Sequence, residues 1–123
     1  MKAVNIKWDT DGELKQIQID KYTRKQAEQF GLENRMIQCT EECGELIQAL
    51  SKYQRILHGD KTCQTDMCHA EYMIVDEIAD VELLLEQIKY LLGNEREVRE
   101  RKLYKLDRTE QRLLESFYEF IQE

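Results

Sequence analysis

Apolar residues recur every three or four positions over most of this 123-residue chain. That spacing is typical of α-helices that bury one face. It predicts helices over residues 21–30, 33–57, 70–92 and 95–121, with a loop over 58–69. Asp20 fits an N-cap, and Gly31 and Gly93 fit helix ends. The predicted fold class is therefore all-α.

The first 20 residues follow a different pattern. Val4, Ile6 and Trp8 alternate with polar residues, and Ile17 and Ile19 alternate again after an Asp-Gly pair at residues 11–12. Alternation around an Asp-Gly turn predicts a short β-hairpin over residues 4–19. An isolated hairpin is marginal in water, so we expect it to pack on the helices or on a partner chain. Residues 1–20 are thus predicted to be a hairpin extension of one all-α domain, residues 21–123.

Composition supports helices and narrows the function. The chain has no proline and five glycines, and its net charge is −7 with a pI near 5.0. An acidic chain is not expected to bind nucleic acid or an anionic membrane. No stretch approaches the ~20 apolar residues of a membrane span, and the N-terminus does not read as a signal peptide. We expect a cytoplasmic protein with reduced cysteines, of which Cys39 and Cys43 pack as small apolar groups.

Two acidic clusters stand out. Glu41, Glu42 and Glu45 lie in one predicted helix, and Glu77 and Asp80 lie in the next. A spacing of three places carboxylates one turn apart on the same face, where they repel. The first cluster alone also fits a solvated helix face, but the second lies among apolar residues, where unpaired carboxylates are costly. Together, on facing antiparallel helices, they predict an oxygen-lined site for Mg²⁺ or Mn²⁺.

The predicted loop offers a second metal hypothesis. It contains Cys63, Cys68 and His69, with His58 at its start. These residues could hold zinc, but they lack the paired spacing of zinc sites. An ordinary polar loop is the favoured interpretation.

The acidic clusters also carry a resemblance to a known family. Residues 41–52 read Glu-Glu-Cys-Gly-Glu-Leu-Ile-Gln-Ala-Leu-Ser-Lys, and residues 77–81 read Glu-Ile-Ala-Asp-Val. This order closely resembles the signature of MazG-like all-α nucleoside triphosphate pyrophosphohydrolases, over about residues 25–112. Two features depart from that pattern: the 31 residues between the clusters (46–76), which are more than usual, and the N-terminal segment, which lies outside the family core.

The resemblance implies a fold, a reaction and a site. The fold is a four-helix-bundle-type core assembled in a homo-oligomer, either a homodimer or a homotetramer. The reaction is Mg²⁺-dependent hydrolysis of a nucleoside triphosphate to the monophosphate and pyrophosphate, which suits nucleotide-pool house-cleaning. The implied metal ligands are Glu42, Glu45, Glu77 and Asp80, and Glu41 would position or deprotonate the attacking water or hold a further ion.

Basic residues complete the predicted site. Lys52 lies two helical turns beyond Glu45 and is placed to bind a phosphate. Lys105, Arg108 and Arg112 would bind the leaving pyrophosphate, or they form a solvated basic flank.

Two alternatives remain open. One is a narrower relative, such as a dUTP/dCTP or phosphoribosyl-ATP pyrophosphatase. The other is a non-catalytic helical interaction module. Base preference is not readable from the sequence, and the candidate stacking residues are Trp8, Tyr53, Tyr72 and Tyr90.

Overall fold

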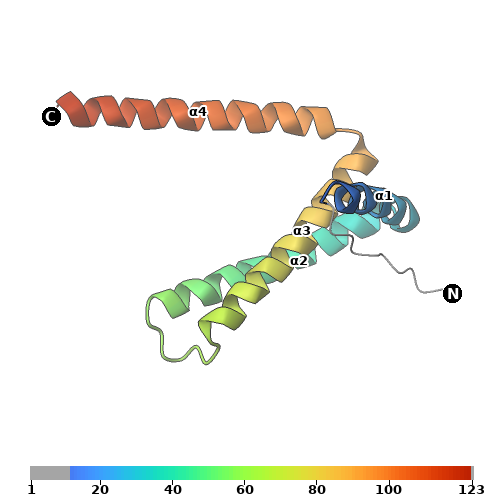
Figure 1. Cartoon of the computed structure of the whole chain (residues 1–123), viewed down its shortest axis with the longest axis horizontal. Coiled ribbons are helices and arrows are strands. Elements are labelled where there is room, and N and C mark those ends of the chain that lie inside the picture. Colours follow the sequence, from blue (N-terminus) through green and yellow to red (C-terminus); the bar gives the residue numbers. More distant parts are fainter. Residues whose placement is uncertain (1–11, 123) are drawn as a thin grey trace. The chain divides into compact units, whose positions relative to one another are not determined.

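The computed structural model describes residues 12–122, which form four α-helices and contain no strand (Figure 1). They are α1 (Gly12–Phe30), α2 (Leu32–Leu57), α3 (Met67–Leu92) and α4 (Glu95–Gln122). The all-α prediction is confirmed. The chain divides into two compact units, one ending at Leu92 that contains α1, α2 and α3, and one beginning at Gly93 that contains α4. None of the four helices is long and apolar enough to cross a membrane within the described residues.

The predicted hairpin is wrong where the structure can be compared with it. Residues 12–19 belong to α1, so the second predicted strand is helical, while residues 4–10 lie outside the described part. The segment is helical because the residues that follow it have helical spacing: Tyr22, Thr23 and Ala27 lie on the covered side of α1. The alternation of Ile17 and Ile19 is too short to outweigh this pattern. The Thr23 hydroxyl donates to the Ile19 carbonyl at 2.6 Å, as one turn of helix requires. Asp20 therefore lies inside the helix rather than at its N-cap.

The other helix boundaries agree closely with the sequence. Gly31 follows α1 with φ +83°, a backbone conformation that favours glycine. The main difference is the start of α3, three residues earlier than predicted. Asp66 accepts a hydrogen bond from the His69 backbone N–H at 2.8 Å, which caps the helix there. The connecting loop is accordingly shorter than predicted, covering residues 58–66.

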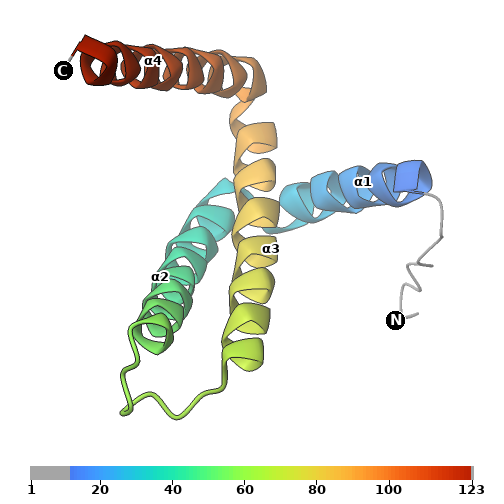
Figure 2. The same ribbon diagram turned by 60° about the vertical axis from the view of Figure 1, so that its left-hand side comes forward.

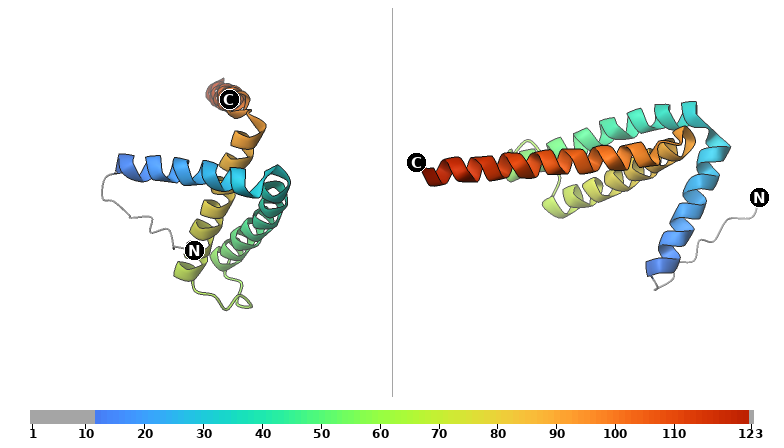
Figure 3. Two further views of the ribbon diagram at one scale, coloured as in Figure 1. Left: turned by 90° about the vertical axis from the view of Figure 1, so that its right-hand side faces the viewer. Right: turned by 90° about the horizontal axis from the view of Figure 1, so that it is seen from above.

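In the first unit, α2 and α3 lie side by side, joined by the loop (Figure 2). α1 crosses the same pair near the other end and packs mainly on α3 (Figure 3). The core is made of small and medium side chains: Ala27, Cys39, Ala49, Ala70, Val81 and Leu84. The burial of Cys39 agrees with its prediction as a small packing group. This antiparallel pairing of α2 with α3 is what brings the two acidic clusters near each other.

Candidate metal centre

Carboxylates from both acidic segments meet between α2 and α3. One oxygen each from Glu42, Glu45 and Glu77 lie within 4.8 Å of one another. One oxygen each from Asp76, Glu77 and Asp80 form a second group, again within 4.8 Å of one another. Glu77 belongs to both groups, so the five residues form one continuous carboxylate cluster. The helical spacing of three or four places each helix's contribution on one face.

Two oxygens of this cluster are buried without a hydrogen-bond partner among the described residues. They are Oε2 of Glu42 and Oε2 of Glu77. The other oxygen of Glu42 accepts a hydrogen bond from the Gln38 side-chain amide at 3.1 Å. A buried acceptor that has lost water and gained no donor costs free energy, and the cost is larger for a charged group. A bound cation would supply the missing partner for both oxygens.

Burial and mutual repulsion raise the pKa values of three carboxyls in the cluster. Burial raises the pKa of Glu77 to about 7, and the close Glu42, Glu45 and Asp80 carboxylates add to the effect. The pKa of Glu45 is raised chiefly by the charge of Glu42. Burial, followed by the charge of Glu42, raises the pKa of Asp80. Three of the five carboxyls therefore have pKa values above their ordinary values, because negative charge is crowded and partly desolvated there.

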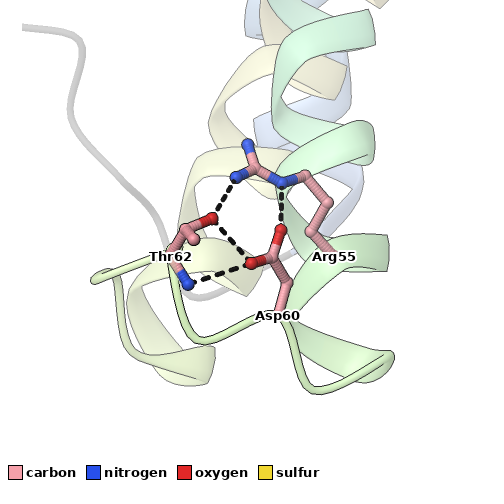
Figure 4. A network of polar contacts seen from close by, with 3 residues as sticks. All are labelled: Arg55, Asp60 and Thr62. Atoms are coloured by element: carbon pink, nitrogen blue, oxygen red, sulfur yellow. Dashed lines mark hydrogen bonds and ion pairs between the residues drawn. The ribbon is translucent and has the colours of Figure 1, made fainter.

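The described part of the chain offers no ion pair to the cluster. Lys52 is half-buried on α2 and makes no ion pair with a described carboxylate. Arg55, near the end of α2, turns towards the loop that follows the helix (Figure 4). Its Nε lies 2.9 Å from Asp60 Oδ2, and its Nη2 donates to the Thr62 hydroxyl at 3.0 Å.

The hydrogen bonds of this loop lower the pKa of Asp60. Asp60 accepts from the Thr62 hydroxyl and backbone N–H, and from Arg55. These interactions, the Thr62 hydroxyl first, lower the pKa of Asp60 to about 2. Arg55 therefore pairs with the loop residues Asp60 and Thr62. It does not neutralise the negative charge of the carboxylate cluster.

The structure brings some of the predicted site residues together and places others elsewhere. Glu42, Glu45, Glu77 and Asp80 all enter the cluster. Glu41 is exposed on α2 and belongs to neither carboxylate group. Lys105, Arg108 and Arg112 are exposed on α4, in the other unit.

One cluster member was missed by the sequence analysis. Asp76 immediately precedes Glu77 and lies four residues before Asp80, so its spacing was already a signal. The zinc hypothesis, in contrast, gains no support from the described residues. The groups able to hold a metal there are the two carboxylate groups, and Cys68 and His69 lie exposed in the first turn of α3.

The chain matches no protein-family model, no curated protein and no solved structure in comparisons with known proteins. What stands is an all-α protein with a carboxylate cluster between two antiparallel helices.

Proposed function

We propose that this protein is a Mg²⁺-dependent nucleoside triphosphate pyrophosphohydrolase of the MazG-like type. The observation that carries the proposal is the carboxylate cluster, with its two buried and unpartnered oxygens. Hard divalent ions take oxygen ligands, and Mg²⁺ in particular favours carboxylates together with water and substrate phosphates. The resemblance of residues 41–52 and 77–81 to the family signature supplies the reaction.

The donor set fits such an ion. Glu42, Glu45, Glu77 and Asp80 would hold it, with Asp76 as a further oxygen donor. When bound, a divalent ion offsets the charge of a polyphosphate and lowers the pKa of a coordinated water. The raised pKa values of Glu45, Glu77 and Asp80 reflect crowded negative charge, which a bound cation would relieve by displacing protons from the cluster.

The neighbouring residues have separate roles in the proposal. Lys52 lies on the same helix as Glu45, two turns further on, and would contact a phosphate oxygen as a point charge. Glu41 lies beside Glu42, and its exposure leaves it accessible to accept a proton from water. Lys105, Arg108 and Arg112 remain predicted ligands of the leaving pyrophosphate.

The unit of α1, α2 and α3 also supports a homodimer or homotetramer. Its buried apolar residues are few, whereas Ile47 and Val75 on the paired helices are each 64% exposed. Leu50, Ile78 and Leu85 are exposed as well. Apolar surface of this extent on a small unit is typical of an interface. The same exposure favours the rival function, a helical interaction module without turnover.

The decisive experiment measures pyrophosphate release from a panel of nucleoside triphosphates, including dUTP, dCTP and phosphoribosyl-ATP. We expect release with Mg²⁺ and none with EDTA. A single active substrate in the panel would identify the narrower relative. Absence of release from every substrate, with Mg²⁺ and with Mn²⁺, would leave the interaction module as the better account.

A further inference from the structure

The large apolar side chains of α4 are exposed from Leu103 to the end of the helix. This helix has 28 residues, and none of them is buried. Its large hydrophobic residues from Leu103 onward are each 53% exposed or more. Five of them, together with Glu110, are spaced alternately by three and four, the heptad spacing of a coiled-coil seam. This α4 seam consists of Leu103, Leu106, Glu110, Leu113, Phe117 and Phe120.

The charged residue in the seam distinguishes two ways of pairing. In a parallel pair, each residue meets its own copy, so Glu110 would face Glu110 of the other helix in the interface. In an antiparallel pair centred between residues 111 and 112, Glu110 meets Leu113. The same register places Leu106 against Phe117 and Leu103 against Phe120. Only the antiparallel arrangement avoids two facing carboxylates and pairs each large ring with a smaller leucine.

The charge distribution along α4 favours the same orientation. Residues 95–108 have a net charge of +2, and residues 109–122 have a net charge of −2. Antiparallel pairing sets each basic half against an acidic half, whereas parallel pairing sets like against like. The basic residues of the first half are Arg96, Arg99, Arg101, Lys102, Lys105 and Arg108.

Most of these charges are not used within the helix. Among the described residues, α4 has one internal ion pair, Arg96 Nε to Glu100 Oε1 at 3.1 Å. Arg101 and Arg108 lie over the Tyr104 ring, 4.7 and 5.9 Å from its centroid. Tyr104 is on the side of the helix away from the seam, so these contacts leave the seam open.

We propose that α4 pairs with α4 of a second copy of this chain, antiparallel and centred near residues 111–112. This proposal does not require that the chain hydrolyses nucleotides. The rest of the same chain is a poorer cover, because residues 12–92 carry 15 acidic and nine basic side chains and would repel the acidic, aromatic half of α4. An anionic membrane is also a poorer cover, because α4 has no net charge and carries Glu110 within its apolar seam.

Distances between spin labels in the full-length protein test the pairing. Labels are introduced as non-canonical amino acids, so that the native cysteines are untouched, at Gln111 in one sample and at Glu97 in another. With about 1.5 Å of rise per residue, the antiparallel axial offset between the two copies is about 1.5 Å at position 111 and about 44 Å at position 97. Because packed helices lie about 10 Å apart and each label extends outward, we expect roughly 20 Å at position 111. At position 97 we expect about 45 Å or more.

Matched variants then locate the interface. Leu113→Lys places a charge in the seam and should abolish the short distance at position 111. Tyr104→Lys adds the same charge on the opposite side and should keep it. A dimer formed only through α1, α2 and α3 would leave the Gln111 distance unaffected by Leu113→Lys.

Other distance patterns overturn the proposal. Short distances at both positions show parallel pairing. No short distance at position 111 shows that α4 is covered by its own chain or stays single. Binding of α4 to phosphatidylserine vesicles, again without a short distance in solution, assigns the seam to a membrane instead.

Discussion

Glu77 is the residue at which the two carboxylate groups meet, and its protonation links the cluster to stability. Its pKa in the folded protein is about 7, above the ordinary value of 4.5. A raised carboxyl pKa stabilises the fold fully below the unfolded value, and this contribution is lost as the pH rises through the folded value. Without metal, the melting temperature should therefore fall between about pH 4.5 and pH 7.

The variant Glu77→Gln isolates this contribution. An amide has no proton to lose, so the fall in melting temperature should be smaller in the variant when both proteins are unfolded thermally in EDTA. Glu82→Gln, an exposed position on the same helix, is the control and should follow the wild type. Parallel profiles for wild type and Glu77→Gln would remove Glu77 from this role.

Neutralising another cluster member tests the cation assignment. Glu45→Gln or Asp80→Asn removes one negative charge while preserving shape, so repulsion in the metal-free protein is reduced. Its melting temperature should hold or rise, whereas the stabilisation that Mg²⁺ provides should shrink. Pyrophosphate release should fall by about 100-fold or more, since the site loses an oxygen donor. Wild-type activity together with a wild-type Mg²⁺ response would show that the cluster is not the metal centre.

Lys52 provides a narrower test of substrate contact. If it contacts a phosphate, Lys52→Ala should lower kcat/KM by about tenfold and leave the Mg²⁺ concentration for half-maximal activity nearly unchanged. Lys61→Ala, at an exposed loop position, controls for the loss of one positive charge. Equal kinetics for the two variants would place Lys52 on an ordinary solvated face.

For single residues, the sequence predicted most members of the carboxylate cluster but not the burial of their oxygens. Four of the five cluster members follow from carboxylates spaced by three on successive helices. The burial of single oxygens on Glu42 and Glu77 depends on how α2 and α3 pack, which no local pattern encodes. Asp76 was missed because its neighbour Glu77 already satisfied the motif, although Asp76 and Asp80 also lie one turn apart.

Among elements, Gln87 links three helices. It lies on α3, is 2% exposed, and accepts a hydrogen bond from Arg35 Nη1 on α2 at 3.1 Å. Its side-chain amide also donates to the Thr23 carbonyl on α1 at 3.2 Å. A single buried amide therefore fixes how α1 and α2 pack on α3.

Replacing this amide should loosen the whole three-helix unit. Gln87→Met keeps the length of the side chain and removes both hydrogen bonds, so the free energy of unfolding should fall by about 1–3 kcal/mol. Urea unfolding measures the change, and Gln54→Met, exposed on α2, controls for the substitution itself. An unchanged urea midpoint would show that Gln87 is not the link between these helices.

The elements themselves were largely predictable. α2 and α3 follow from long helical periodicity that stops near a glycine, α4 follows from periodicity alone, and the boundaries of all three were within three residues. The first half of α1 was not predicted, because Ile17 and Ile19 alternate as in a strand. The alternation covers too few residues to distinguish a strand from a helix. Both are exposed in the structure, so their alternation reflects no buried face.

For the whole molecule, the periodicity of the sequence shows that each helix has an apolar face. It does not show which helix, of this chain or of another copy, packs against that face. The sequence led to the expectation of one domain over residues 21–123, which stays a prediction, and the structure adds that the chain divides at Gly93 into two compact units. The extent of exposed apolar surface emerged only from the structure, where Ile47, Val75 and the apolar residues of the α4 seam are each more than half exposed. This exposed apolar surface is what the proposed assembly with further copies would cover.

The proposed reaction can be defined by the phosphorus atom that water attacks. The chain has no glycine-rich phosphate loop of the kind that P-loop ATPases use, but it has five carboxylates around one site. The proposed function therefore predicts attack at the α-phosphorus, with intact pyrophosphate leaving. Hydrolysis in ¹⁸O-labelled water, followed by mass spectrometry, should place the label in the nucleoside monophosphate and leave pyrophosphate unlabelled. Label in pyrophosphate would mean attack at the β-phosphorus, and orthophosphate with a nucleoside diphosphate would assign the protein to a different class of hydrolase.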